Sequence, residues 1–207
     1  MRVLFQDSWL IAVEKPPGLL SQPGLGVDQQ DSLIGRLQFV DPELRLVHRL
    51  DRDTSGLLLL ARGAESLRRF SMLFSARRVR KLYLAVVVGR MNRNAGTISF
   101  PMARLQKNPP LYGKNPQGKD SRSQWRVRSC HSKGSTLWLW PLTGRSHQLR
   151  AHLASVGHPI LGDPIYGKEV FFERMYLHAT ALSFRHPFTG QRLRLRSRAP
   201  FIPAQEN

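Results

Sequence analysis

The stretch "VHRLDRDTSGLLLLAR", residues 47–62, joins a polar segment to a continuous apolar run. The apolar run Leu57–Ala61 is short and bounded by polar residues, which is typical of a buried β-strand. The segment before it contains a histidine, two aspartates and two arginines. Charged side chains beside a core are costly unless they are paired or used in function. The stretch therefore predicts a loop with a chemical role at the start of a buried strand.

Asp51 lies between Arg49 and Arg52 in this loop. A neighbouring guanidinium favours the ionised form of a carboxylate. An ionised and poorly solvated carboxylate can act as a nucleophile or as a base. The residues alone leave two alternatives open. One is a surface turn with salt bridges, and the other is an acid–base pair of Asp51 with Asp53, as in a glycosidase, although alternate residues of an extended chain point apart.

Charge is the most informative property of the composition. The chain of 207 residues has 32 basic and 14 acidic residues, a formal net charge of +18. Between Thr54 and Gly162, 19 Lys or Arg residues face only two acids, Glu65 and Asp120. Arginine predominates, and its planar guanidinium suits bidentate contacts with phosphate. The distribution predicts a polyanionic partner, with nucleic acid favoured over a membrane surface because no basic amphipathic helix dominates.

The remaining composition predicts a folded protein of a reducing compartment. Apolar residues make up 41% of the chain, and the length favours a single domain over residues 1–207. Cys130 is the only cysteine, which excludes an intramolecular disulfide and a cysteine-rich zinc site. No apolar run approaches the ~20 residues of a spanning helix, and no signal peptide is visible. We expect a cytoplasmic protein, a monomer by default, without contact with a membrane.

The hydrophobic periodicity predicts more strands than helices. Two short strands are expected within residues 2–15, with a turn near residues 6–8 between them. Further strands are expected at 57–61, 81–89, 97–105, 121–128 and 136–142. Residues 182–184 and 191–196 are expected to form a hairpin. Helices are expected at 64–77 and 146–156, with a short one starting near Asp31. Residues 106–119 are interpreted as a flexible basic loop. Neighbouring strands are too close in sequence for helical crossovers, so we expect an α/β (α+β) domain with a mixed, largely antiparallel central sheet flanked by helices and loops.

A second group of polar residues lies in "LTGRSHQLRAHLASVGHPILGDPIYG", residues 142–167. Arg145 stands at a strand-to-helix turn. The helix dipole favours anions at this end of a helix and therefore does not explain a cation there, so Arg145 is better explained as a partner for a carboxylate or phosphate. His147, His152 and His158 have irregular spacing without a clustered carboxylate, which argues against a metal site. Asp163 is expected to bond its own backbone in a turn.

A third feature is the basic run that leads into a strand in "RRVRKLYLAVVVG", residues 77–89. It carries Tyr83. A basic run beside an exposed aromatic ring is what nucleic-acid backbone tracking with base stacking requires, although a tyrosine on a strand is more often an ordinary core or surface residue.

Together these motifs resemble the RluA-type family of RNA pseudouridine synthases, over about residues 1–190. "VEKPPGL" (13–19) is similar to the first loop of that family, and "HRLDRDTSGLLLLAR" (48–62) is similar to its catalytic motif. "RKLYLAVVVG" (80–89) resembles the tyrosine motif, and residues 142–167 resemble the third motif. "LHATALSFRHPFTG" (177–190) resembles the closing strands. The resemblance implies a pseudouridine-synthase-like domain that isomerises uridine in structured RNA.

The resemblance also implies roles for five residues. Asp51 corresponds to the catalytic aspartate, and Arg145 to an arginine that pairs with it. Tyr83 corresponds to a tyrosine that packs against the target base and assists proton removal at its carbon 5. Leu149 corresponds to an apolar position of the base pocket, and Arg49 to a contact with RNA near the extruded nucleotide.

The implied reaction is an isomerisation, which needs no cofactor and no metal. The implied partners are tRNA or ribosomal RNA stem-loops. Because the catalytic loop begins within fifty residues of Met1, we expect the catalytic domain itself to bind the RNA. The target nucleotide must be flipped out of the stack, at a cost of a few kcal/mol that basic and aromatic side chains offset. The alternative is a non-catalytic RNA-binding or ribosome-assembly factor on the same fold.

Overall fold

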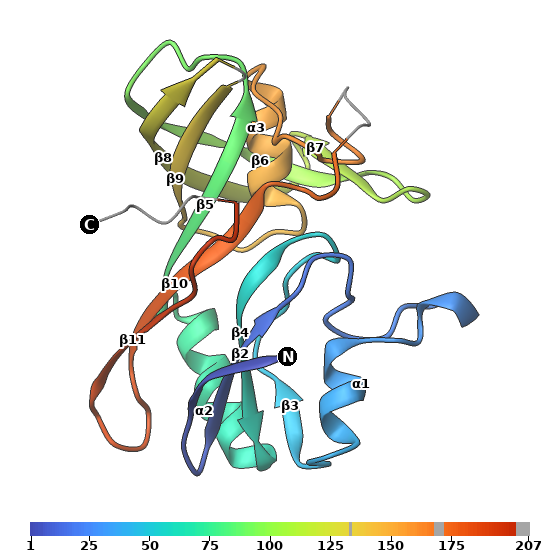
Figure 1. The fold of residues 1–207 in the computed structure, drawn as a ribbon, viewed down its shortest axis with the longest axis vertical. Helices are drawn as coiled ribbons and strands as arrows, with labels where there is room; N and C mark the ends of the chain where they lie inside the picture. Colours follow the sequence, from blue (N-terminus) through green and yellow to red (C-terminus); the bar gives the residue numbers. More distant parts are fainter. Residues whose placement is uncertain (133, 168–171, 202–207) are drawn as a thin grey trace. The chain divides into compact units, whose positions relative to one another are not determined.

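The computed structural model describes residues 1–132, 134–167 and 172–201, which form two compact units. Unit 1 contains Met1–Lys81 and the chain from His178 onward, and unit 2 contains Leu82–Leu177. Figure 1 shows the helices and strands of both units. The described strand pairs inside each unit are antiparallel except for one, so the predicted mixed and largely antiparallel α+β fold is confirmed.

Unit 1 is built on a sheet with the strand order β1-β2-β4-β10. β11 pairs with β10, and β3 pairs with β4. The elements are β1 (Arg2–Gln6), β2 (Leu10–Lys15), η1 (Val27–Gln29), α1 (Leu33–Gln38), β3 (Leu44–Leu46), β4 (Ser55–Arg62), α2 (Gly63–Ser75), β10 (Leu177–Arg185) and β11 (Arg192–Arg196).

The centre of unit 1 is β4, the apolar run that follows the polar loop. Leu57, Leu58, Leu59 and Leu60 are completely buried, as expected for a strand covered on both faces. β4 is antiparallel to β2 and parallel to β10. Gly56 has φ +111° and lies so close to β10 that a Cβ atom there would be 2.4 Å from the Ala179 carbonyl oxygen. A glycine is therefore required where β4 begins.

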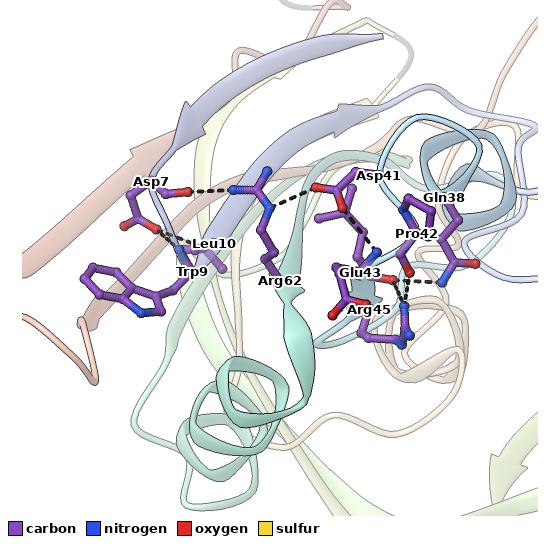
Figure 2. Close-up of polar contacts among 10 residues, drawn as sticks. Asp7, Trp9, Leu10, Gln38, Asp41, Pro42, Glu43, Arg45 and Arg62 are labelled. Atoms are coloured by element: carbon purple, nitrogen blue, oxygen red, sulfur yellow. Dashed lines mark hydrogen bonds and ion pairs between the residues drawn. The ribbon is translucent and has the colours of Figure 1, made fainter.

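Arg62 anchors the far end of β4, as Figure 2 shows. Its Nε donates to the Asp41 carboxylate at 2.8 Å, and its Nη1 donates to the Asp7 carbonyl at 3.2 Å. Asp7 in turn accepts from the backbone N–H groups of Trp9 and Leu10. The end of β4 is thus tied both to the β1–β2 turn and to the loop between α1 and β3.

Unit 2 is an antiparallel sheet with the order β5-β9-β8-β6-β7 and one helix packed on it. Its elements are β5 (Arg80–Val88, whose first two residues belong to unit 1), β6 (Ala95–Gln106), β7 (Leu111–Lys114), β8 (Lys119–His131), β9 (Gly134–Pro141) and α3 (Gln148–Ser155). The apolar core lies between the sheet and α3 and includes Val87, Leu137, Leu139 and Leu153, all at most 1% exposed.

Most of the predicted elements are present, with one clear correction. The sequence predicts a flexible loop over residues 106–119, but Leu111–Lys114 form β7, which pairs with β6. Pairing with β6 orders this segment, although its local sequence, rich in Pro, Gly and Asn, does not predict a strand. The short strand β3 and the 3₁₀-helix η1 are also absent from the sequence-based prediction.

None of the helices in the described ranges combines the length and apolar composition needed to cross a bilayer. The longest of them is α2, with 13 residues.

Candidate active site

The loop that carries Asp51 is held from both sides by residues of the segment 15–21. The Ser21 hydroxyl donates to the Leu50 carbonyl at 2.7 Å and accepts from the Leu50 N–H at 3.1 Å. On the other side of Asp51, the Lys15 Nζ donates to the Arg52 carbonyl at 2.8 Å. The backbone on both sides of the Asp51 side chain is therefore fixed by contacts distant in sequence.

Lys15 is completely buried, although lysine is one of the residues least often found inside a protein. Its Nζ also donates to the carbonyls of Pro16 at 2.8 Å and Leu19 at 2.6 Å. An ammonium group has three donors, and these three carbonyls satisfy all of them. The buried ammonium thus joins the loop after β2 to the loop of Asp51, and hydrogen bonds compensate its desolvation.

The loop turns back toward β4 directly after Asp51. The Thr54 N–H donates to the Asp51 carbonyl at 3.1 Å, which closes a tight turn. The next residue, Ser55, begins β4, and its hydroxyl is 2.8 Å from Nδ1 of the buried His178 on β10. The turn and this contact place the Asp51 side chain, which is partly exposed, at the start of β4.

His48 supports the same loop from within. Its Nε2 accepts a hydrogen bond from the Leu59 N–H at 3.1 Å, and its ring stacks on Phe74 at a centroid distance of 4.6 Å. Burial, and secondarily the positive charge of Lys81, lowers the pKa of His48 from its usual 6.5 to about 3. His48 is therefore neutral at physiological pH, as its acceptor role requires. Arg49, the next residue, is exposed.

In unit 2, Arg145 stands in a turn organised by Gln148. The buried Gln148 side chain accepts from the Thr143 hydroxyl at 2.6 Å and from the Arg145 N–H at 3.0 Å. It donates to the Arg122 carbonyl at 3.0 Å and to the Ser123 hydroxyl at 2.9 Å. The two bonds that the amide accepts close the turn, and the two that it donates join the turn to β8. The Arg145 Nε donates to the Asp120 carbonyl of the same strand at 3.1 Å.

The helix after this turn begins later than the sequence predicts. α3 starts at Gln148 rather than Ser146 because His147 has φ +53°, the left-handed region that a helix does not contain. The His147 Nδ1 is 3.1 Å from the Tyr166 hydroxyl, which also contacts the backbone of Tyr112 on β7. These contacts hold the unusual backbone conformation between Arg145 and Leu149.

Tyr83 and Leu149 both contact the apolar core of unit 2. Leu149 is 7% exposed and belongs to the core cluster, and the half-buried Tyr83 of β5 packs against that cluster. Arg145 lies one turn before Leu149 in the chain. Unit 2 therefore brings Tyr83 and Leu149 to one core cluster, and Arg145 lies in the turn just before Leu149.

The five predicted site residues fall into two groups. Arg49 and Asp51 share one loop of unit 1, while Tyr83, Arg145 and Leu149 lie in unit 2. The pairing of Asp51 with Arg145 stays a prediction. The predicted backbone turn at Asp163 is confirmed, because its Oδ1 accepts from the N–H groups of Ile165 and Tyr166. Within the described part of the chain, no three His, Cys, Asp or Glu side chains gather as a metal site would require.

Sequence reasoning missed the residues that hold the site: Lys15, Ser21, His48 and Gln148. A lysine at the end of the apolar strand "LIAVEK" was the available signal for Lys15. Gln148 gave no comparable signal, since the two groups that it ties to the turn belong to β8, about 25 residues away in sequence.

Comparisons with known proteins show which family the chain belongs to. Residues 9–155 match the model of the RNA pseudouridylate synthase family. A dual-specificity RNA pseudouridine synthase RluA of Vibrio cholerae is 40% identical over 89% of this chain and 77% of its own. The RluA of Yersinia pestis is 37% identical over 97% of this chain and 100% of its own.

A solved structure is similar over almost the whole chain. Human RNA pseudouridylate synthase domain containing 1 has a TM-score of 0.81 and 29% identity, covering 97% of this chain and 84% of that chain. The chain therefore belongs to the RNA pseudouridylate synthases, within them to the RluA type, and is an isomerase that converts uridine in RNA to pseudouridine.

Proposed function

We propose that Asp51 is the catalytic aspartate of this isomerase. In the reaction the bond between the ribose C1′ and N1 of uracil breaks, and a bond between C1′ and C5 forms. The C5 proton leaves and N1 gains a proton, so the RNA keeps its mass. Asp51 either attacks C1′ or removes a proton from the ribose, and both roles require an ionised carboxylate.

The other predicted site residues take supporting roles. Tyr83 packs against the extruded base and assists removal of the C5 proton, and Leu149 supplies an apolar wall. Arg145 pairs with the Asp51 carboxylate. Arg49 contacts the RNA next to the extruded nucleotide. The contact of Tyr83 and Leu149 with one core cluster supports their shared role at the base.

The observation that carries this proposal is the way the Asp51 loop is held. A completely buried lysine and a buried serine bind the backbone on either side of Asp51, while its side chain stays partly exposed. A fixed backbone with an accessible carboxylate is what preorganised catalysis needs. A surface turn without function has no need of a buried ammonium group.

The substrate class we propose is structured RNA, with tRNA or ribosomal RNA stem-loops as targets and the target nucleotide flipped out. The dual specificity in the name of the RluA relatives supports this range. We further propose that the 207 residues act as one catalytic domain in the cytoplasm, as a monomer.

The test is the activity of Asp51→Asn, with Asp53→Asn in the same loop as the matched control. Incubation with bulk tRNA and ribosomal RNA, carbodiimide derivatisation and reverse-transcription mapping measure pseudouridine formation. Asp51→Asn is expected to lose at least about 10⁴-fold in rate and Asp53→Asn less than about 10-fold. Full activity in Asp51→Asn would refute the proposal.

A further inference from the structure

The sheet of unit 2 has a second face, opposite the one that carries Tyr83. Side chains alternate between the two faces along each strand, and residues directly opposite on paired strands share a face. Tyr83 pairs with Leu139, whereas the next residue of β5, Leu84, pairs with Trp138. Trp138 and Trp140 of β9 therefore lie on the face away from Tyr83 and the core.

Arginines of β8 continue this second face. Gln124 is opposite Trp140, and Arg126 is opposite Trp138. Arg122, Gln124 and Arg126 are exposed, while the alternate residues of β8 are buried. The guanidinium of Arg128 is 5.6 Å from the centre of the Trp138 ring. We call this surface the arginine–tryptophan strip, and its members are Arg122, Gln124, Arg126, Arg128, Trp138 and Trp140.

The arginines of the strip have no carboxylate partner among the described residues. No ion pair of Arg122, Arg126 or Arg128 occurs there, and the only acidic residue of the strands β5–β9 is Asp120, at one end of β8. By contrast, exposed arginines of unit 1 such as Arg36 and Arg68 contact carboxylates at 2.6 and 2.8 Å. The strip thus concentrates positive charge that an external anion can neutralise.

The shape of the strip suits a nucleic-acid chain, whose planar bases can stack on aromatic rings. The β6 residues opposite Arg126, Gln124 and Arg122 are Ala95, Thr97 and Ser99, which are small and exposed. They leave room beside the arginine row, and the two tryptophan rings border it on the other side. Base stacking on aromatic rings beside a positive row is the usual means of binding nucleic acid without sequence preference.

We infer that the arginine–tryptophan strip binds RNA, namely a segment of the substrate remote from the target uridine. Charge complementarity favours RNA over an apolar partner, because the apolar residues of this face on β5, Leu84 and Val86, are already buried. The inference rests on RNA being the substrate of this family, but it does not depend on the role of Asp51. The strip would add affinity and leave the chemical step to the opposite face.

The test compares two double variants that remove the same charge. Arg126→Ala/Arg128→Ala removes two strip arginines, and Arg36→Ala/Arg68→Ala removes two exposed arginines that are already ion-paired. Binding of fluorescently labelled unfractionated tRNA is titrated between about 50 and 300 mM salt, and thermal unfolding confirms that both variants are folded. We expect the strip variant to raise Kd about 5- to 10-fold and to reduce the salt slope by about 1.4 to 1.8, and the control to change Kd less than about 2-fold.

Crosslinking locates the contact directly. RNA containing 5-bromouridine, irradiated on the Asp51→Asn protein, is expected to crosslink to peptides containing Trp138 or Trp140. Because Asp51→Asn is used, a failure of the catalytic proposal leaves this result readable. Equal Kd values in the two double variants would overturn the inference, as would crosslinks confined to other peptides. A concentration-dependent dimer that the strip variant abolishes would assign the surface to a second copy and overturn it as well.

Discussion

At the scale of single residues, buried polar side chains hold the backbone of the loops that carry Asp51 and Arg145. Lys15 and Gln148 are buried, and seven hydrogen bonds of their side chains are described: the ammonium donates three, and the amide donates two and accepts two. Five of these reach main-chain groups: Arg52 and Arg145 in the loops that carry Asp51 and Arg145, Pro16 and Leu19 in the loop after β2, and Arg122 on β8. Each buried residue therefore fixes a backbone segment next to a predicted site residue.

Lys15→Met tests this positioning role. It keeps the length of the side chain but removes the donor from three carbonyls, those of Leu19, which is buried, and of Pro16 and Arg52. We expect this to lower the free energy of unfolding by about 2–4 kcal/mol. We also expect kcat at saturating RNA to fall, because the Arg52 carbonyl is no longer held. Urea denaturation and single-turnover rates measure the two effects. The exposed Lys114→Met is the control, and equal stabilities of the two variants would contradict the assignment.

At the scale of secondary-structure elements, the parallel pair β4–β10 governs where the Asp51 loop ends. His178 is opposite Ser55, and Ala179 is opposite Gly56. The approach of the two backbones at Gly56 leaves no room for a side chain, and the hydroxyl of Ser197 completes the contacts of His178 at 2.8 Å. The start of β4 is consequently a rigid point rather than a free loop end.

Gly56→Ala measures the importance of this close approach. A Cβ atom would lie 2.4 Å from the Ala179 oxygen and 2.6 Å from its nitrogen, so the strands must separate. We expect a loss of about 3 kcal/mol or more in unfolding free energy. Gly190→Ala is a matched control, because Gly190 also has a positive φ, +73°, but a Cβ atom added there would meet no other atom within 4 Å. A loss of about 1 kcal/mol is expected for this control. Chemical denaturation measures the unfolding free energies of both variants. Similar losses in the two would show that the cost at Gly56 comes from backbone strain alone and not from the close approach of β10.

At the scale of the whole molecule, stability depends on keeping buried histidines neutral. Burial lowers the pKa of His152 from 6.5 to about 4. Its Nε2 contacts the Ser121 hydroxyl at 2.8 Å, while its buried Nδ1 has no hydrogen-bond partner in the described part of the structure. A proton added at Nδ1 would therefore be buried and unpaired. His48 adds a second neutral ring with a pKa of about 3.

The sign of the pH effect follows from these pKa values. Between pH 6.5 and about 4 the unfolded chain binds a proton at residue 152 that the folded protein does not, so stability falls as the pH falls. From about pH 6.5 to pH 5, His152 accounts for a loss of about 2 kcal/mol. In His152→Leu this part of the loss is expected to disappear. Urea denaturation of both proteins at about pH 7.5 and pH 5 measures it, and an unchanged pH dependence would be inconsistent with a neutral His152.

Sequence patterns predicted the elements whose signal is local. The alternation of "TLWLWPL" and the apolar run after Asp51 identified strands because each pattern is contained within a few residues. β7 was missed because Gly113 and the prolines before it are poor strand formers, and only pairing with β6 orders the segment. The third motif of the family resemblance gave Arg145 a role, but it did not reveal the amide of Gln148 that holds its turn.

The contacts that position the site could not be predicted from the sequence because they join residues that are far apart along the chain. The partners of Lys15 and Ser21 lie up to 37 residues away, and they are backbone carbonyls that any residue type would supply. The buried ion pair of Arg150 with Asp163, at 2.7 Å, was missed likewise, although the turn at Asp163 was predicted from its local sequence.

Cys130, the only thiol of the chain, is exposed on β8, two positions beyond Arg128. A maleimide fluorophore would consequently attach at one site and yield a homogeneous conjugate without any engineered cysteine. If RNA binds the arginine–tryptophan strip, an environment-sensitive dye at Cys130 would change its emission on binding, which would also allow rapid-mixing measurements.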